Sequence, residues 1–199
     1  MEFGGMLSLD FYLHQNPDGG ALLDWSRRLR IAAGAARGLE YLHKVASPPV
    51  IHGCVKPSNI LVDVKFCARL CDYGLHFLAS QERQGLAGYV DEEYWLNKSG
   101  ASKECDVFGL GVVLLELLSG RRSDYYQENV INIVQWALPL IKGLKFSELF
   151  DTRLAIPFNI EPLVRLARVA LACVGNSRPN RPCIAQVATI LTNLEMDLY

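Results

Sequence analysis

The sequence predicts a mainly helical fold with a few short β-strands in its first half. Several long segments repeat their apolar residues every three to four positions, which is the spacing of the buried face of a helix. Short apolar pieces suited to strands are confined to residues 50–71. Half of the 199 residues are hydrophobic, so the chain can bury a substantial core as one domain or one large lobe.

The first helix is expected over residues 25–44. Asp24 is a suitable N-cap, and apolar residues such as Trp25, Leu29 and Leu39 recur on one face of the segment. The stretch Ser-Pro-Pro at residues 47–49 ends the helix because proline does not continue it. Small strands are then expected at residues 50–52, 60–62 and 68–71.

The second half of the chain is expected to begin with a long loop and then to be helical. Residues 74–100 show no sustained periodicity, only glycine, charge and scattered aromatic residues. Pro162 suits the first turn of a helix. The expected helices cover residues 107–118, 130–141, 162–173 and 184–195.

Composition excludes several classes of function and location. Lysine and arginine total 20 against 21 aspartate and glutamate, so we expect no nucleic-acid partner, and any basic site must be local. The six cysteines lack the spacing of zinc sites or disulfide frameworks, which favours reduced thiols in a cytoplasmic protein. The apolar run at 107–118 is too short to cross a bilayer and contains Glu116, so no transmembrane segment is expected.

Four motifs occur in order along the chain. They are HGCVKPSN at 52–59, CDYGL at 71–75, GYVDEEYW at 88–95 and DVFGLGVVLLELLSGRR at 106–122. Together with LDWSRRLRIAAGAARGLEYLH and RPNRPCIAQV, they resemble the C-terminal lobe of the plant receptor-like Ser/Thr protein kinases. The resemblance implies a protein-kinase-like fold that is mainly α, with a few short strands around the catalytic loop.

The resemblance covers nearly the whole chain, from the hinge region at Met1 to the last helix. It implies one protein-kinase-like domain over residues 1–199 that holds the hinge and the C-terminal lobe only. The glycine-rich loop, strand lysine and helix glutamate of the N-terminal lobe have no counterpart in this chain. Two explanations stay open: the lobe is genuinely missing, or the chain is a truncated piece of a longer product.

The resemblance also assigns the residues that would handle magnesium and ATP. Asn59 and Asp72 match the two metal-ligating side chains, and Lys56 matches the lysine that contacts the transferred phosphate. Residual binding of magnesium and ATP is therefore one hypothesis. The alternative, which we favour, is that Asn59 and Asp72 are inherited loop scaffolding without a bound ion, because two ligands without ATP phosphates make a poor magnesium site.

The position of the catalytic base departs from the family. Histidine-arginine-aspartate reads His52-Gly53-Cys54, and a neutral thiol is a poor hydrogen-bond acceptor. An inert thiol is favoured over a thiolate nucleophile because the sequence suggests no base for Cys54. The arginine that would pair with a phosphorylated residue is Gly53, and the substrate-side threonine is Leu86. No catalytic residue set is therefore intact.

Two acidic positions are expected to support the fold. Alanine-proline-glutamate reads Asp91-Glu92-Glu93, and the resemblance implies that Glu93 forms a buried ion pair with Arg181. Asp106 matches the aspartate that supports the catalytic loop, although a simple helix cap explains it equally well.

The pattern of retained and lost residues leads to two main hypotheses. The first is an inactive receptor-like kinase, a pseudokinase, that acts as an interaction or signalling scaffold. The alternative is a fragment of a weakly active, ATP-dependent Ser/Thr receptor-like kinase. A protein partner is expected, with another receptor-like kinase as one candidate, and the resemblance places the parent protein at the cytoplasmic face of the plasma membrane.

Overall fold

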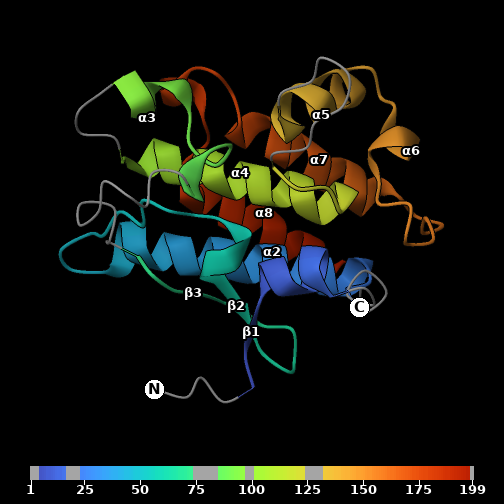
Figure 1. Ribbon diagram of the computed structural model, residues 1–199, viewed down its shortest axis with the longest axis horizontal. Helices are drawn as coiled ribbons and strands as arrows, with labels where there is room; N and C mark the ends of the chain where they lie inside the picture. The colour runs from blue at the N-terminus through green and yellow to red at the C-terminus, as the bar shows by residue number, and fades with distance from the viewer. Residues whose placement is uncertain (1–4, 17–22, 74–84, 97–100, 124–131, 198–199) are drawn as a thin grey trace.

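The helices form a packed bundle with a small sheet on one side (Figure 1). The computed structural model describes residues 5–16, 23–73, 85–96, 101–123 and 132–197. Helix α4, Lys103–Ser119, packs against α7, Glu161–Cys173, and against α2, Trp25–Glu40. Helix α2 also packs along α8, Ile184–Met196. The sheet lies against α2, on the opposite side of the molecule from α3, α5 and α6 (Figure 1).

The long helices begin at side chains that cap their first turn. Asp24 accepts a hydrogen bond from the Arg27 backbone N–H at the start of α2, which confirms the predicted cap. Ser102 accepts one from the Cys105 N–H at the start of α4. After Glu40, α2 continues as a π-helical turn, Tyr41–Val45, so the predicted helix over 25–44 is confirmed almost to its end.

The described part of the sheet has three antiparallel strands in the order β1-β2-β3. These are β1, Leu7–Ser8, β2, Ile60–Val62, and β3, Ala68–Leu70. The strands predicted at 60–62 and 68–71 are therefore confirmed. The strand predicted at 50–52 is wrong, because the N–H of His52 bonds to the side chain of Asp106 instead of to a neighbouring strand.

The helices of the second half follow the predicted periodicity. Helix α5, Ile133–Lys142, and helices α4, α7 and α8 lie where they were expected. Two short helices were not predicted: α3, Glu92–Leu96, inside the expected loop, and α6, Phe146–Leu149. The other short pieces are the π-helical turn Phe11–Gln15 and the 3-10 turns Pro57–Asn59 and Arg178–Asn180. Much of the predicted loop, residues 74–84 and 97–100, lies outside the described residues.

A charged pair is buried in the core between α2 and the segment that follows α6. Arg28 is fully buried, and its guanidinium donates to the carbonyl oxygens of Leu23 and Leu117 at 2.8 and 2.7 Å. Its third contact is with the Asp151 carboxylate at 2.7 Å, which also binds Arg153. Burial lowers the pKa of Arg28 and Asp151 opposes this, so the pair holds a charged guanidinium in an apolar core.

The apolar run of α4 is part of this core. Nearly every residue from Cys105 to Ser119 is buried among the other helices. Among the described residues, no helix combines the length and the apolar character that a membrane span requires.

Candidate functional site

The loop at residues 52–59 is held in place by one carboxylate on α4. Asp106 is buried and accepts hydrogen bonds from the backbone N–H groups of His52 and Gly53 at 2.8 and 2.7 Å. A third bond joins Asp106 to Nε2 of His43 at 2.8 Å. Because Ser102 caps α4, Asp106 supports the loop and is not the cap, which decides between the two roles considered from the sequence.

A glycine lets this loop lie directly against α4. A Cβ at Gly109 would come within 2.8 Å of the Val55 carbonyl oxygen and 3.0 Å of the Tyr89 carbonyl oxygen. Any side chain there would push both segments away from the helix. Gly109 and Asp106 together therefore fix where the backbone of the loop runs.

The His52 side chain is held in the interior of the protein by packing and by a backbone hydrogen bond. Its ring is fully buried and packs edge-to-face with Tyr73 at 6.3 Å between centroids. Burial lowers the pKa of His52, and Nδ1 accepts a hydrogen bond from the Cys54 N–H at 3.3 Å. Nε2 then carries the proton of the neutral ring, and it has no hydrogen-bond partner among the described residues. The ring is thus poorly placed to exchange protons with solvent.

Cys54 lies against an apolar cluster. The half-buried side chain packs on a cluster formed by Leu86, Val90, Tyr94 and Cys105. Burial raises the pKa of Cys105 to about 12, as expected for a thiol among apolar groups. Leu86 is also buried, so two positions that the resemblance expected to be polar, 54 and 86, contribute to the same apolar packing.

Lys56 and Asn59 both bond to nearby backbone. The Lys56 ammonium donates to the Gly85 carbonyl oxygen at 3.3 Å, which links the loop to the segment that contains Leu86. The Asn59 amide nitrogen donates to the Cys54 carbonyl oxygen at 3.0 Å. Asn59 Nδ2 therefore holds the loop closed, while its Oδ1 is the atom suited to a cation.

Asp72 follows the end of β3 by two residues. The Cys71 N–H donates to the Asn59 carbonyl oxygen at 3.0 Å, which ties the two strand ends together. Asp72 is exposed and has a φ of +57°, a left-handed conformation that aspartate tolerates better than most residues. Burial, followed by the Asp72 charge, raises the pKa of the Cys71 thiol to about 11, so that thiol is neutral at pH 7.

The oxygens of Asn59 and Asp72 alone do not complete a cation site. Asn59 and Asp72 are oxygen ligands of the kind magnesium prefers, but two side chains leave most of its coordination to other groups. The described part of the chain contains no cluster of three or more histidine, cysteine, aspartate or glutamate residues able to hold a metal ion.

A comparison with known families accounts for this arrangement. The model of the protein kinase domain matches residues 4–186. The chain belongs to the protein kinase family. Kinases of this family normally bind ATP and magnesium, and they carry the loop at 52–59 as the catalytic loop.

Individual relatives place the chain among plant receptor-like kinases. It is 41% identical over 169 residues to the serine/threonine-protein kinase-like protein CCR2 of Arabidopsis thaliana, covering 85% of this chain and 20% of that protein. The solved pseudokinase domain of BIR2, an immune regulator of the RLK/Pelle family, is 34% identical with a TM-score of 0.82; the match covers 96% of this chain and 58% of that one. The kinase domain of maize SIRK1 bound to AMP-PNP is 29% identical with a TM-score of 0.80, covering 96% and 67%.

The chain spans only part of these kinases. It covers between a fifth and a half of the length of the curated relatives it matches. The family model and the two solved structures show the kinase fold over most of this chain.

The kinase ion pair near the end of the lobe uses a different carboxylate from the one predicted. Asp91, not Glu93, binds Arg181, at 2.6 Å, and Arg178 makes two more bonds to the same carboxylate at 2.6 and 2.7 Å. Glu93 is half-buried, and its carboxylate lies 3.5 Å from Arg178. The prediction for Glu93 was wrong because the short helix α3 begins just after Asp91, so that Asp91 meets both arginines and Glu93 meets Arg178.

This ion pair predicts a specific dependence of stability on pH. Burial by itself raises the pKa of Asp91, but the hydrogen bonds from Arg178 and Arg181 outweigh it and lower the pKa to about 2. Since the folded pKa lies below the unfolded one, the stabilisation is fully present above about pH 4 and is lost as the pH falls toward about 2. Urea unfolding of the natural chain and of Asp91→Asn is the measurement. The two free energies of unfolding are expected to converge across this range, and a difference that stays constant down to pH 2 would contradict the assignment.

A second buried network was missed by the sequence analysis. Glu116 of α4 is fully buried and contacts His14 Nε2 at 2.6 Å and the Tyr89 hydroxyl at 2.5 Å. Burial, followed by the charge of Glu116, raises the pKa of Tyr89. Glu116 inside an apolar run was the available signal, but its partners lie 102 and 27 residues away. This network ties the segment after residue 85 to the core of the kinase lobe.

Proposed function

We propose that this chain is a receptor-like pseudokinase lobe that acts as an interaction or signalling scaffold and does not transfer phosphate. The observation that carries the proposal is the packing of Cys54 on the apolar cluster that contains Leu86. Phosphoryl transfer to a hydroxyl uses an acceptor for the hydroxyl proton at that place. Here the same place holds a sulfur atom and apolar side chains.

The expected loss of rate is large. Removal of a general base typically lowers a rate by about 100-fold to 10,000-fold. His52 does not replace the base, because its ring is buried and its Nδ1 already accepts the Cys54 N–H. Gly53 also leaves the chain without the arginine that would receive a phosphorylated residue.

Within this proposal, Asn59 and Asp72 are inherited loop scaffolding, and any residual binding of magnesium and ATP is weak. Asn59 and Asp72 would supply two oxygens to the ion, and Lys56 would give up its bond to Gly85 to reach a phosphate. ATP bound there would supply the phosphate oxygens that complete the coordination of the ion. We assign these three residues a residual binding role and no catalytic one.

The domain organisation, location and partner of the parent protein are inferred from the similar receptor-like kinases. We infer that residues 1–199 form the hinge and C-terminal lobe of a kinase-like domain whose parent protein works at the cytoplasmic face of the plasma membrane. A protein partner is expected, and another receptor-like kinase is the leading candidate. The likeness to the BIR2 pseudokinase domain supports this role.

The alternative is weak Ser/Thr kinase activity of a longer product. Its support is that Lys56, Asn59 and Asp72 are all present and that the AMP-PNP-bound SIRK1 domain has the same fold. A loose transition state depends more on positioning and metal ions than on a base, so slow transfer is chemically reasonable.

A phosphate-transfer assay distinguishes the inactive pseudokinase from the weakly active kinase. Radiolabelled ATP and magnesium are incubated with the chain, and with the longest natural product that contains it, in the presence of a serine-rich acceptor protein. We expect the same background from the natural sequence as from Asp72→Ala. Metal-dependent transfer that disappears in Asp72→Ala would overturn the proposal and establish the alternative.

Thermal unfolding with magnesium and ATP measures binding separately from transfer. Because a ligand stabilises the folded chain by RT ln(1 + [L]/Kd), weak binding gives little shift even at about 1 mM ATP. Asp72→Ala is the matched control. A shift of several degrees that the variant loses would show a working nucleotide site.

A further inference from the structure

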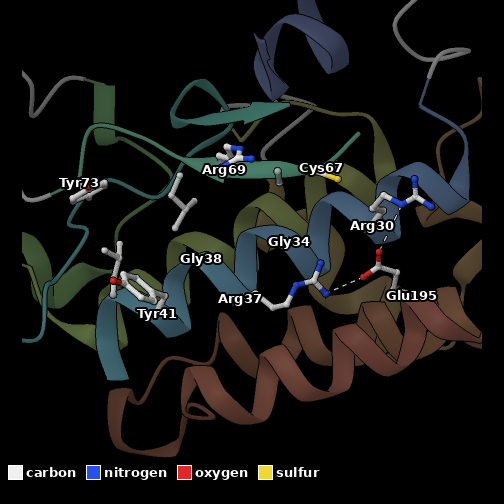
Figure 2. Close-up of a pocket in the computed structure, with 12 residues that line it drawn as sticks. Arg30, Gly34, Arg37, Gly38, Tyr41, Cys67, Arg69, Tyr73 and Glu195 are labelled. Atoms are coloured by element: carbon white, nitrogen blue, oxygen red, sulfur yellow. Dashed lines mark hydrogen bonds and ion pairs between the residues drawn. The ribbon is translucent and has the colours of Figure 1, made fainter. Parts of the chain in front are cut away.

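A groove lies along α2, and one end of it reaches Tyr73, which packs on His52 of the loop at residues 52–59. It has a volume of about 670 Å³ and is bounded by α2, by β3 and by the end of α8 (Figure 2). Gly34 and Gly38 form part of its floor. A Cβ at Gly34 would lie 3.2 Å from Ala68, and one at Gly38 would lie 3.3 Å from Leu70. The glycines therefore bring β3 close to the helix and add no side chains to fill the groove.

The groove concentrates positive charge in a chain whose overall charge is −1. Three arginines and one glutamate line it, a surplus of two positive charges. Arg37 and Arg30 lie 2.9 and 3.7 Å from Glu195 (Figure 2). Arg69 on β3 is exposed and has no ion pair among the described residues. Two arginines thus share one carboxylate, and the third, Arg69, interacts only at longer range with the charge of Asp63.

The other end of the groove is aromatic. Tyr41 and Tyr73 line it and are 57% and 51% exposed, although large hydrophobic residues are usually more deeply covered. Leu42 and Leu70 also line the groove. One end of the groove is therefore suited to carboxylates and the other to an apolar side chain (Figure 2).

We propose that this groove binds an acidic, extended peptide segment of a protein partner. Arg30 and Arg37 are seven residues apart on α2, which corresponds to about 10 Å along the helix axis. On an extended chain of the polyproline II type, side chains three residues apart lie on the same face, about 9 Å apart. Guanidinium groups bind carboxylates through paired hydrogen bonds, so this spacing matches the charges of the segment. An apolar residue of the segment packs between Tyr41 and Tyr73.

This inference rests on the proposed interaction role and specifies the chemistry of the partner. It does not depend on whether phosphate is transferred. A nucleic acid is a poor alternative, because the chain has a net charge of −1 and the surplus in the groove is only two positive charges.

The test uses synthetic peptides and fluorescence anisotropy. The probe is a labelled peptide with glutamates three residues apart, followed by a tryptophan, with glycine and serine between them. Two control peptides replace the glutamates with lysine or the tryptophan with alanine. We expect the acidic peptide to bind, and about 500 mM salt to weaken binding relative to about 50 mM, since screening acts on exposed charges.

Charge reversal identifies the site. Arg69→Glu is expected to weaken peptide binding by at least about tenfold, because it places a like charge in the groove. Arg168→Glu is the matched control: it makes the same change at an exposed arginine on α7 that does not line the groove, and is expected to leave binding unchanged. Circular dichroism checks that both variants are folded.

Several outcomes would overturn the inference. These are no binding at about 1 mM peptide, equal binding of the lysine peptide, or an equal effect of Arg168→Glu and Arg69→Glu. Self-association of the chain that Arg69→Glu abolishes would assign the groove to a second copy and would also overturn it. Since the transfer assay is independent, failure of peptide binding together with absent phosphate transfer rejects this site and leaves the pseudokinase proposal standing.

Discussion

Replacing Asp106 with alanine is expected to destabilise the chain by about 3 to 5 kcal/mol. The variant leaves three buried donors without their acceptor: His43 Nε2 and the N–H groups of His52 and Gly53. Each buried donor left unsatisfied costs roughly 1 to 3 kcal/mol. Since whole domains are stable by only about 5 to 15 kcal/mol, a large part of the folded population is at risk. Urea unfolding followed by circular dichroism measures the change.

The matched control for this variant is Glu104→Ala. Glu104 is an exposed acid in the first turn of the same helix, so its removal is expected to change the free energy of unfolding by no more than about 0.5 kcal/mol. If Asp106→Ala unfolds at the same urea concentration as Glu104→Ala, the bonds from Asp106 do not hold the loop.

Replacing Asp151 with alanine is the second change with a large expected effect. It leaves the fully buried guanidinium of Arg28 with only the carbonyl oxygens of Leu23 and Leu117. Removal of one member of a buried ion pair typically costs about 3 to 5 kcal/mol, because the remaining charge stays in an apolar core. The midpoint of thermal or urea unfolding reports the loss.

An exposed ion pair on the same molecule serves as the comparison. Asp197 lies 3.2 Å from Arg165, and both side chains are well exposed, so Asp197→Ala is expected to cost no more than about 1 kcal/mol. A double variant, Arg28→Met with Asp151→Leu, should recover much of the stability lost in Asp151→Ala. Equal effects of Asp151→Ala and Asp197→Ala would show that burial does not control the strength of this pair.

The helices of this fold were predictable where periodicity and capping agree. Residues 25–44 combine a long apolar face with Asp24 at its start, and α2 begins at Trp25 as expected. The helices α3 and α6 are five and four residues long, too short to show a period. The apolar piece at 50–52 suggested a strand, but the backbone there bonds to Asp106, which sequence alone does not place nearby.

In the candidate site, too, local sequence patterns located some residues, whereas contacts between distant parts of the chain were not predictable. The motifs locate Cys54, Lys56, Asn59 and Asp72 because these residues are close together in the sequence. Motif spacing did not identify which carboxylate meets Arg181, since Asp91 and Glu93 are two residues apart and only the start of α3 separates their directions. The contacts of Glu116 with His14 and Tyr89 depend on tertiary packing, which no local pattern records.

Asp106 holds the loop through backbone groups, so this support does not require the catalytic side chains of the family. The two N–H groups that it binds in the loop belong to the peptide backbone, and every residue except proline has one. The bond from Asp106 therefore does not depend on the side chain at position 54, whereas position 53 favours glycine because its φ is +79°. In the proposed pseudokinase, the aspartate of the catalytic loop can be replaced at little cost in folding, so the surface of the lobe would stay available for selection on recognition without catalysis.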